Sequence, residues 1–412
     1  MRSNDLIHFC PPARLVFGCG SRAQLAPLLA RLGYRSGVLI TDTFFSEKTP
    51  WVREYVEAAS ALGIFTVVYD GGKPDPTTTL CDEATKIIRA ELGDIRPDHV
   101  IALGGGSNID LAKALCLTIP NGRPVSNFIG ALPNAPQALP MIALPTTAGT
   151  GSEATPGAIL IDPTNATKVA VMDNVLRPVI ALIDPEFTYT CPPRVTADSG
   201  VDALTHALES YLTLDSSEFD RGGHPDPGYS GRSSLTMMFA HEAIKLCAQY
   251  LMRTYNNGSD TDARIGMAYA SHYAALSYGG AGLNAVHGIA YAVAGLTHQS
   301  HGSTNAVMLP YVLDALRTVR HTELLEIARL FGITGSDEAS AVRQLPVLIR
   351  DLVAQLGIPT TLEAFGITQE QLPALTVDAL AVTRLAKAFP VADVPATYAE
   401  IVKHAWHGKL GD

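Results

Sequence analysis

The sequence predicts an α/β domain built on a parallel sheet, followed by an all-helical domain. Strand-like and helix-like segments alternate through the first half of the 412 residues, and this rhythm is typical of βαβ units. After Pro193 the β-branched runs give way to alanine-rich segments of helical periodicity that continue to the end. We therefore expect the two domains to span residues 1–191 and 192–412.

Composition restricts the class of protein. Apolar residues make up 47% of the chain and charged residues 17%, so a large core can be buried. A net charge of −10 without a long basic run argues against nucleic acid as a partner. We find no uncharged apolar run of about 18 residues and no apolar signal core, so we expect no membrane span and no secretory leader. The six cysteines are scattered without a CxxC pair, which favours reduced thiols in a cytoplasmic protein.

The first domain can be divided into elements in order along the chain. Apolar, β-branched runs predict strands at residues 13–17, 37–41, 65–69, 99–103, 140–144, 158–161, 169–172 and 179–183. Amphipathic spacing predicts helices at residues 24–32, 50–62, 78–92 and 111–117. We expect Thr49 to be the N-cap of the helix that begins at Pro50.

A glycine-rich turn follows the strand at residues 99–103 and precedes a helix. It contains Gly104, Gly105, Gly106 and Ser107. Three glycines exceed what a turn needs, and a helix N-terminus offers N–H groups and a positive dipole end to a phosphate. The pattern is not the GxGxxG fingerprint, and a turn selected only for positive φ is the alternative.

Two further polar positions follow strand ends. Asp42 follows the strand at residues 37–41, where a carboxylate can bind a ribose 2′-hydroxyl and repel a 2′-phosphate, so it favours NAD over NADP. An Asx turn or a helix cap is the alternative for Asp42. The loop after residues 140–144 carries several hydroxyl groups that can bind a ribose, a pyrophosphate or an amide, or form only an ST-turn, at Thr146, Thr147, Thr150 and Ser152.

The helical half contains a candidate metal site. Asp202 and His206 are four residues apart in a run that is typical of a helix, so both side chains lie on one face. His287 and His301 follow in an apolar region interrupted by glycines. One carboxylate and three imidazoles suit Fe(II) or Zn(II) better than Ca²⁺ or Mg²⁺. A local hydrogen bond between Asp202 and His206 is the alternative.

Four motifs occur in a fixed order along the chain: GGGSNIDLAKA, LPTTAGTGSEAT, GVDALTHALESY and VHGIAYAVAGLTHQSHGSTNAVMLPYV. With these motifs the chain resembles, over nearly its whole length, the iron-containing (group III) alcohol dehydrogenase family, which is related in fold to dehydroquinate synthase. The resemblance implies a Rossmann-like NAD-binding α/β domain, an all-helical metal-binding domain, a site in the cleft, and a homodimer or larger homo-oligomer. It also implies an oxidoreductase that transfers a hydride between an alcohol, or a hydroxy acid, and NAD.

The resemblance implies a role for individual residues. The implied ligands of Fe(II), with Zn(II) as the second choice, are Asp202, His206, His287 and His301. The implied cofactor contacts are Asp42, Gly104, Gly105, Gly106, Ser107, Thr146, Thr147, Thr155 and Lys168. Tyr291 and His298 are candidates for the proton relay, although Tyr291 can be a packing residue and His298 a solvated loop residue.

Two departures from the family pattern concern the substrate. Family members often read His-Gly-x-x-His at the third ligand, where this chain has Tyr291, and the loop at residues 215–233 is longer than in the simplest alcohol dehydrogenases. Both features look like the hydroxyacid–oxoacid transhydrogenase branch, which is our alternative function. A metal-dependent lyase is disfavoured, because residues 201–214 and 279–310 contain no Lys or Arg for a phosphate-bearing substrate. A non-catalytic nucleotide or metal sensor is a third alternative.

Overall fold

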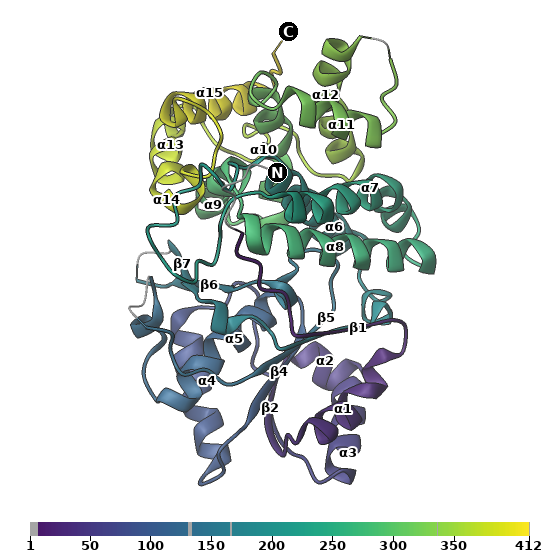
Figure 1. Ribbon diagram of the computed structural model, residues 1–412, viewed down its shortest axis with the longest axis vertical. Coiled ribbons are helices and arrows are strands. Elements are labelled where there is room, and N and C mark those ends of the chain that lie inside the picture. The colour runs from purple at the N-terminus through teal and green to yellow at the C-terminus, as the bar shows by residue number, and fades with distance from the viewer. Residues whose placement is uncertain (1–6, 131–133, 165–166, 336, 412) are drawn as a thin grey trace. The chain divides into compact units, whose positions relative to one another are not determined.

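The computed structural model describes residues 7–130, 134–164, 167–335 and 337–411, which divide into two compact units (Figure 1). The α/β unit holds Cys10–Tyr189 and Asp226–Gly228, and the helical unit holds residues 7–9, Thr190–Pro225 and the chain from Tyr229 onward. One unit is built on a parallel sheet and the other on helices, so the predicted fold class is confirmed.

A six-stranded parallel sheet forms the α/β unit, in the order β1-β8-β5-β4-β2-β3. Its strands are β1 (Arg14–Phe17), β2 (Ser36–Ile40), β3 (Phe65–Tyr69), β4 (His99–Gly104), β5 (Met141–Pro145) and β8 (Ile180–Ile183). A separate antiparallel hairpin consists of β6 (Gly157–Asp162) and β7 (Thr167–Met172). Because β2 pairs with β3 on one side and β4 on the other, the strand order reverses between β2 and β4.

Helices cover both faces of this sheet (Figure 1). One face carries α4 (Thr78–Leu92) and α5 (Gly106–Asn121), and the other carries α1 (Leu25–Leu32) and α3 (Trp51–Ala61). Successive residues of β2 alternate between the two cores: Val38 and Ile40 pack on the first face and Leu39 on the second. Burial on both faces explains why the central strands are continuously apolar in the sequence.

Two predicted helix starts were wrong. The helix predicted at residues 111–117 begins at Gly106, so the glycine motif forms its first turn. Thr49 does not cap α3, whose N-cap is Pro50. Thr49 is instead the C-cap of α2 (Thr43–Lys48), and the hydroxyl of Thr49 donates to the carbonyl of Phe45 in that helix. The six-residue α2 is too short to show a helical period and was not predicted.

Ten α-helices are found among the described residues of the helical unit. They are α6 (Pro193–Leu212), α7 (Ser234–Asn256), α8 (Thr261–Ala281), α9 (Ala285–Thr297), α10 (His301–Ala315), α11 (His321–Leu330), α12 (Glu338–Gln355), α13 (Leu372–Ala381), α14 (Thr383–Ala386) and α15 (Val394–His407). Helix α6 packs against α7, α8 and α10, and its side chains are buried from Gly200 to Leu212. Within the described residues, no helix combines the length and the apolar character that a membrane crossing requires.

The long loop after α6 is tied where it begins and ends. Arg232, only 6% exposed, forms ion pairs with Asp215 at 3.0 Å and with Glu323 of α11 at 2.6 Å. These contacts fix both ends of the loop against the helical unit.

Candidate active site

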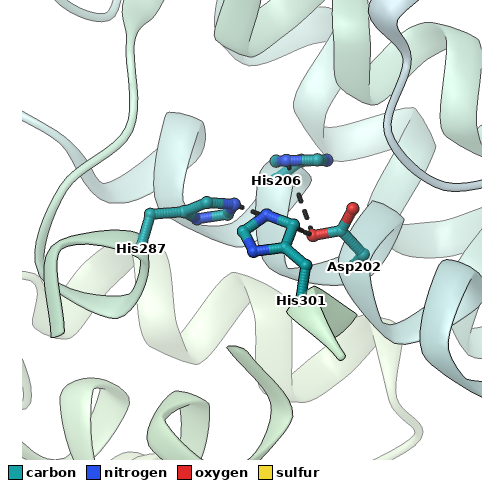
Figure 2. Close-up of side chains that lie close together, drawn as sticks. All are labelled: Asp202, His206, His287 and His301. Carbon is teal, nitrogen blue, oxygen red and sulfur yellow. Dashed lines mark ion pairs between the residues drawn. The ribbon is translucent and has the colours of Figure 1, made fainter. Parts of the chain in front are cut away.

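Four side chains of the helical unit converge on one point (Figure 2). Asp202 and His206 come from α6, His287 from α9, and His301 is the first residue of α10. The Nε2 atoms of the three imidazoles lie 3.6, 3.7 and 3.7 Å from the same atom, Oδ1 of Asp202. The four residues, which we call the quartet, offer ligand atoms that all lie within 4.8 Å of one another.

Helix geometry and one glycine bring the quartet together. The spacing of four residues places Asp202 and His206 on one face of α6. A Cβ at Gly302 would lie 2.0 Å from the carbonyl oxygen of Asp198, so α10 can begin this close to α6 only with glycine there. The next residue, Ser303, donates its hydroxyl to the Asp198 carboxylate at 2.5 Å. Gly302 and Ser303 therefore hold the neighbouring His301 beside α6.

The distances in the quartet suit a metal ion better than hydrogen bonds. A separation of 3.6 Å is too long for a hydrogen bond between Asp202 and His206. Ligands about 2.1 Å from a tetrahedral ion lie about 3.4 Å from one another. Burial raises the pKa of Asp202, but His206, His301 and His287 together hold that pKa below its usual range. A carboxylate that stays charged in a buried site needs positive charge beside it, and a divalent cation would supply that charge.

Glu209 belongs to this centre and was not predicted from the sequence. One of its oxygens accepts a hydrogen bond from Nδ1 of His287, and the other accepts from the N–H groups of Asn284 and Val286, at 3.1 and 2.8 Å. In the neutral ring, donation from Nδ1 fixes the tautomer in which Nε2 of His287 carries the lone pair that faces the quartet. Burial lowers the pKa of His287, but Glu209 and Asp202 raise it to about 9.

Asn305 is the second residue that sequence reasoning missed. Its Nδ2 donates to Oδ1 of Asp202 at 2.8 Å and lies 3.1 and 3.3 Å from Nε2 of His287 and His301. The amide therefore holds the carboxylate oxygen toward the imidazoles. Its place one turn after His301 on α10 was the signal that could have identified it.

Of the two relay candidates, the structure brings only Tyr291 to the quartet. The Tyr291 ring stacks on His301 with 5.6 Å between ring centroids, and it meets His287 edge-on at 6.2 Å. His298 is the exposed C-cap of α9, in the left-handed conformation with φ 54°. Among the residues that the structure describes, no hydrogen bond joins His298 to the quartet.

In the α/β unit, the candidate cofactor residues gather at the carboxyl ends of neighbouring strands. Asp42 follows β2 and Gly104 ends β4, the two strands between which the strand order reverses. Open α/β sheets bind their ligands outside such a reversal. Asn108 of α5 connects the two ends, because its Nδ2 donates to Oδ2 of Asp42 at 2.7 Å. The other oxygen of Asp42 caps α2 by accepting from the N–H of Phe44 at 2.9 Å.

Side chains of the same unit pack closely against the glycine loop. Gly104 has φ 151°, and a Cβ there would lie 2.2 Å from Nδ2 of Asn108. A Cβ at Gly106 would lie 2.6 Å from the side chain of Thr150. The N-cap of α5 is Gly105, which has no side chain to cap the first N–H groups of the helix. Glycine is therefore needed at Gly104 and Gly106 for this close packing, while the role of the loop in phosphate binding stays a prediction.

The remaining candidates take part in contacts within the loops. The N–H of Thr146 donates to the carbonyl of Gly104 at 3.0 Å, and Thr147 lies next to Gly105. The hydroxyl of Ser107 accepts from the N–H of Asp75 at 3.3 Å.

Thr155 and Lys168 have partners inside the α/β unit. The buried Lys113 of α5 donates to the hydroxyls of Ser152 and Thr155 at 2.8 and 3.1 Å. Burial lowers the pKa of Lys113 to about 8. Nζ of Lys168 lies 3.6 Å from a carboxylate oxygen of Asp75. The cofactor roles of Thr155 and Lys168 stay predictions, while Lys113 orders the hydroxyl-rich loop.

Comparison of the sequence with known protein families and proteins shows to which family the chain belongs. The model of "Iron-containing alcohol dehydrogenase" matches residues 12–185, and the model of "Fe-containing alcohol dehydrogenase family, C-terminal" matches residues 229–404. Long-chain-alcohol dehydrogenase 1 of Geobacillus thermodenitrificans (strain NG80-2) is 35% identical over 97% of this chain and 98% of its own length. NAD-dependent methanol dehydrogenase of Bacillus methanolicus is 30% identical over 90% of this chain and 92% of its own length.

The solved structures include an alcohol dehydrogenase from Oenococcus oeni with a TM-score of 0.87 and 26% identity, covering 97% of this chain and all of that one. The family suggested by the four motifs is therefore confirmed, and with it the assignment of the chain as an oxidoreductase. The chain belongs to the iron-containing alcohol dehydrogenase family.

Proposed function

We propose that this protein transfers a hydride between an alcohol and NAD, and so interconverts an alcohol with an aldehyde or ketone, at a centre formed by the quartet. The observation that carries the proposal is the arrangement of three imidazole Nε2 atoms around one buried carboxylate oxygen. The names of the relatives, a long-chain-alcohol dehydrogenase and an NAD-dependent methanol dehydrogenase, support the same reaction class.

The quartet would hold Fe(II), with Zn(II) as the alternative, because one carboxylate and three imidazoles suit both ions. The chemistry that such an ion supplies when bound is polarisation of the substrate's oxygen atom. Glu209 keeps the ring of His287 in the required tautomer, and Asn305 holds the carboxylate of Asp202.

Cofactor binding belongs, in this proposal, to the α/β unit, and metal binding to the helical unit. Residues Gly104–Ser107 would bind the pyrophosphate, because the backbone can approach closely and the helix dipole favours an anion. Asp42 would accept hydrogen bonds from the ribose and repel a 2′-phosphate, which selects NAD over NADP. Thr146, Thr147, Thr155 and Lys168 complete the set that we assign to the cofactor.

A proton must reach or leave the substrate oxygen as the hydride moves. We assign this relay to Tyr291, which stacks on His301, and to the exposed His298, which can exchange protons with solvent. We further propose that the protein acts in the cytoplasm. We also propose that it forms a homodimer or larger homo-oligomer, and light scattering during size-exclusion chromatography tests this oligomeric state.

The proposal is tested by following NADH formation with a panel of alcohols on protein loaded separately with Fe(II) and Zn(II). We expect turnover in proportion to bound metal and to added NAD. Product formation without stoichiometric NAD would instead identify a transhydrogenase that keeps its nicotinamide bound. Metal and NAD binding without turnover on any substrate would identify a sensor.

A further inference from the structure

Arg384 is far from the quartet in the sequence but is connected to it through the ring of Tyr291. Its helix, α14, packs against α9, where Leu385 lies beside Gly288. The guanidinium carbon of Arg384 is 5.8 Å from the ring centroid of Tyr291. The same Tyr291 ring stacks on the imidazole of His301. Two successive ring contacts therefore connect a guanidinium to the quartet.

This guanidinium has no acceptor in the described parts of the chain. Nε of Arg384 is buried without a hydrogen-bond partner, and no ion pair to the side chain is found among the described residues. Two other arginines of the helical unit have acceptors: Arg232 pairs with two carboxylates, and Arg320 donates to the carbonyls of Leu212 and Thr213. Buried polar groups are nearly always hydrogen-bonded, so the buried Nε of the half-buried Arg384 is an exception that a ligand can resolve.

The carboxylates of the centre are already engaged. Glu209 accepts from His287 and from the first N–H groups of α9, and Asp202 faces the three imidazoles. A divalent ion in the quartet, with one carboxylate and three neutral imidazoles, carries a net charge of about +1, which the carboxylate of Glu209 beside His287 offsets. Arg384 on the side of Tyr291 therefore carries a positive charge that no carboxylate of the centre neutralises. An anion on the substrate is the group that this charge favours.

We propose that Arg384 is a specificity-determining residue that binds an anionic group, a carboxylate or a sulfonate, on the substrate. The inference rests on the proposed function and names its substrate class: small alcohols and aldehydes that carry an acid group, in preference to neutral ones of the same size. The planar fork of a guanidinium matches the two oxygens of such a group and gives stronger, charge-assisted hydrogen bonds.

The test compares succinate semialdehyde with its methyl ester as substrates of the metal-loaded full chain, with NADH as reductant. We expect a higher kcat/KM for the free acid. In Arg384→Gln the kcat/KM for the acid falls by about 10- to 100-fold, because a hydrogen bond to a charged group is lost, while the ester changes little. Arg343→Gln, which removes an exposed arginine of α12, is the matched control and changes neither substrate.

Two further arms separate the possible outcomes. A sulfonate analogue of the same chain length shows whether the site accepts both anions or only a carboxylate. Arg384→Lys keeps the charge but loses the planar fork. This variant should therefore keep part of the preference for the acid over the ester, and it replaces Arg384→Gln in the test where that variant does not fold. Equal kcat/KM for acid and ester in the wild type, or an equal loss of both in Arg384→Gln, overturns the proposal.

Binding measured without turnover distinguishes this inference from the proposed function. Calorimetric titration of succinate into the metal- and NAD-loaded protein should show binding that Arg384→Gln weakens about tenfold or more. If no aldehyde is reduced but this binding and its loss are seen, the reaction is wrong and the anion site stands. If aldehydes are reduced and succinate binds the variant and the wild type alike, the reaction stands and the anion site is wrong.

Discussion

Glu209 of α6 and His287 of α9, 78 residues apart in the chain, are joined by a buried hydrogen bond from the imidazole Nδ1 to the carboxylate. Glu209→Gln keeps the shape but removes the charge, so Nε2 of His287 becomes a weaker and less well oriented ligand. We expect metal affinity to fall by about 10–100-fold, as is usual when such a supporting residue is lost.

Competition with a chelator measures this affinity in the wild type and in Glu209→Gln. Glu242→Gln, which removes a surface carboxylate paired with Lys245, is the control and should bind metal as the wild type does. An unchanged affinity in Glu209→Gln would mean that the hydrogen bond has no part in metal binding.

Asp42 decides the choice of cofactor in our account. Asp42→Asn keeps an oxygen that can cap α2 but loses the negative charge, whereas Asp42→Gly loses both. Both variants should raise the ratio of kcat/KM for NADP to that for NAD, and the glycine variant should in addition lose about 0.3 kcal/mol of stability with the cap. A wild-type preference for NADP, or ratios that stay constant in both variants, contradicts this assignment.

The buried Lys113 should make stability depend on pH in the alkaline range. Its pKa is lowered to about 8 by burial, below the value of about 10.4 in an unfolded chain. The unfolded state therefore binds more protons between these values, and the contribution of Lys113 to stability rises with pH across this window, by up to about 2 kcal/mol between pH 8 and 10.

Urea unfolding at several pH values measures this dependence. The reference is the double variant Lys113→Met/Asp110→Asn, because burial also raises the pKa of the neighbouring Asp110 and the carboxylate would titrate anew without its lysine. The wild type should gain stability relative to the double variant as the pH increases. A constant difference between the two proteins excludes a buried, titrating lysine.

Tyr291 is assigned to the proton relay by its contact with His301. Tyr291→Phe keeps the ring and loses the hydroxyl, so metal content should stay at the wild-type level while the pH profile of turnover shifts. Steady-state kinetics across the pH range, with elemental analysis of the same samples, measures both. Identical profiles would leave Tyr291 as a packing residue.

The quartet could be predicted from the sequence because two of its members share a helix face and the other two stand in a recognisable motif. Glu209 could have been found, since it follows His206 by three residues on the same face and has no basic residue near it in the chain. Asn305 had the same kind of signal beside His301.

Arg384 could not be found in this way. Residues 201–214 and 279–310 contain no Lys or Arg, and this absence suggested a site without basic side chains. Only the packing of α14 against α9 brings a guanidinium to Tyr291. The start of α5 was missed for a local reason: glycine propensity argues against a helix at Gly106, but the buried contacts of α5 outweigh it.

The central claim is that the quartet binds the metal ion, and the most direct test is the metal content of His206→Ala. Three ligands remain in this variant, so we expect bound metal and activity to fall steeply, while calorimetry shows NAD binding at the wild-type affinity. His404→Ala, on the exposed face of α15, is the control and should retain its metal. Full metal occupancy in His206→Ala, measured by elemental analysis, would contradict the four-ligand centre and the reaction assigned to it.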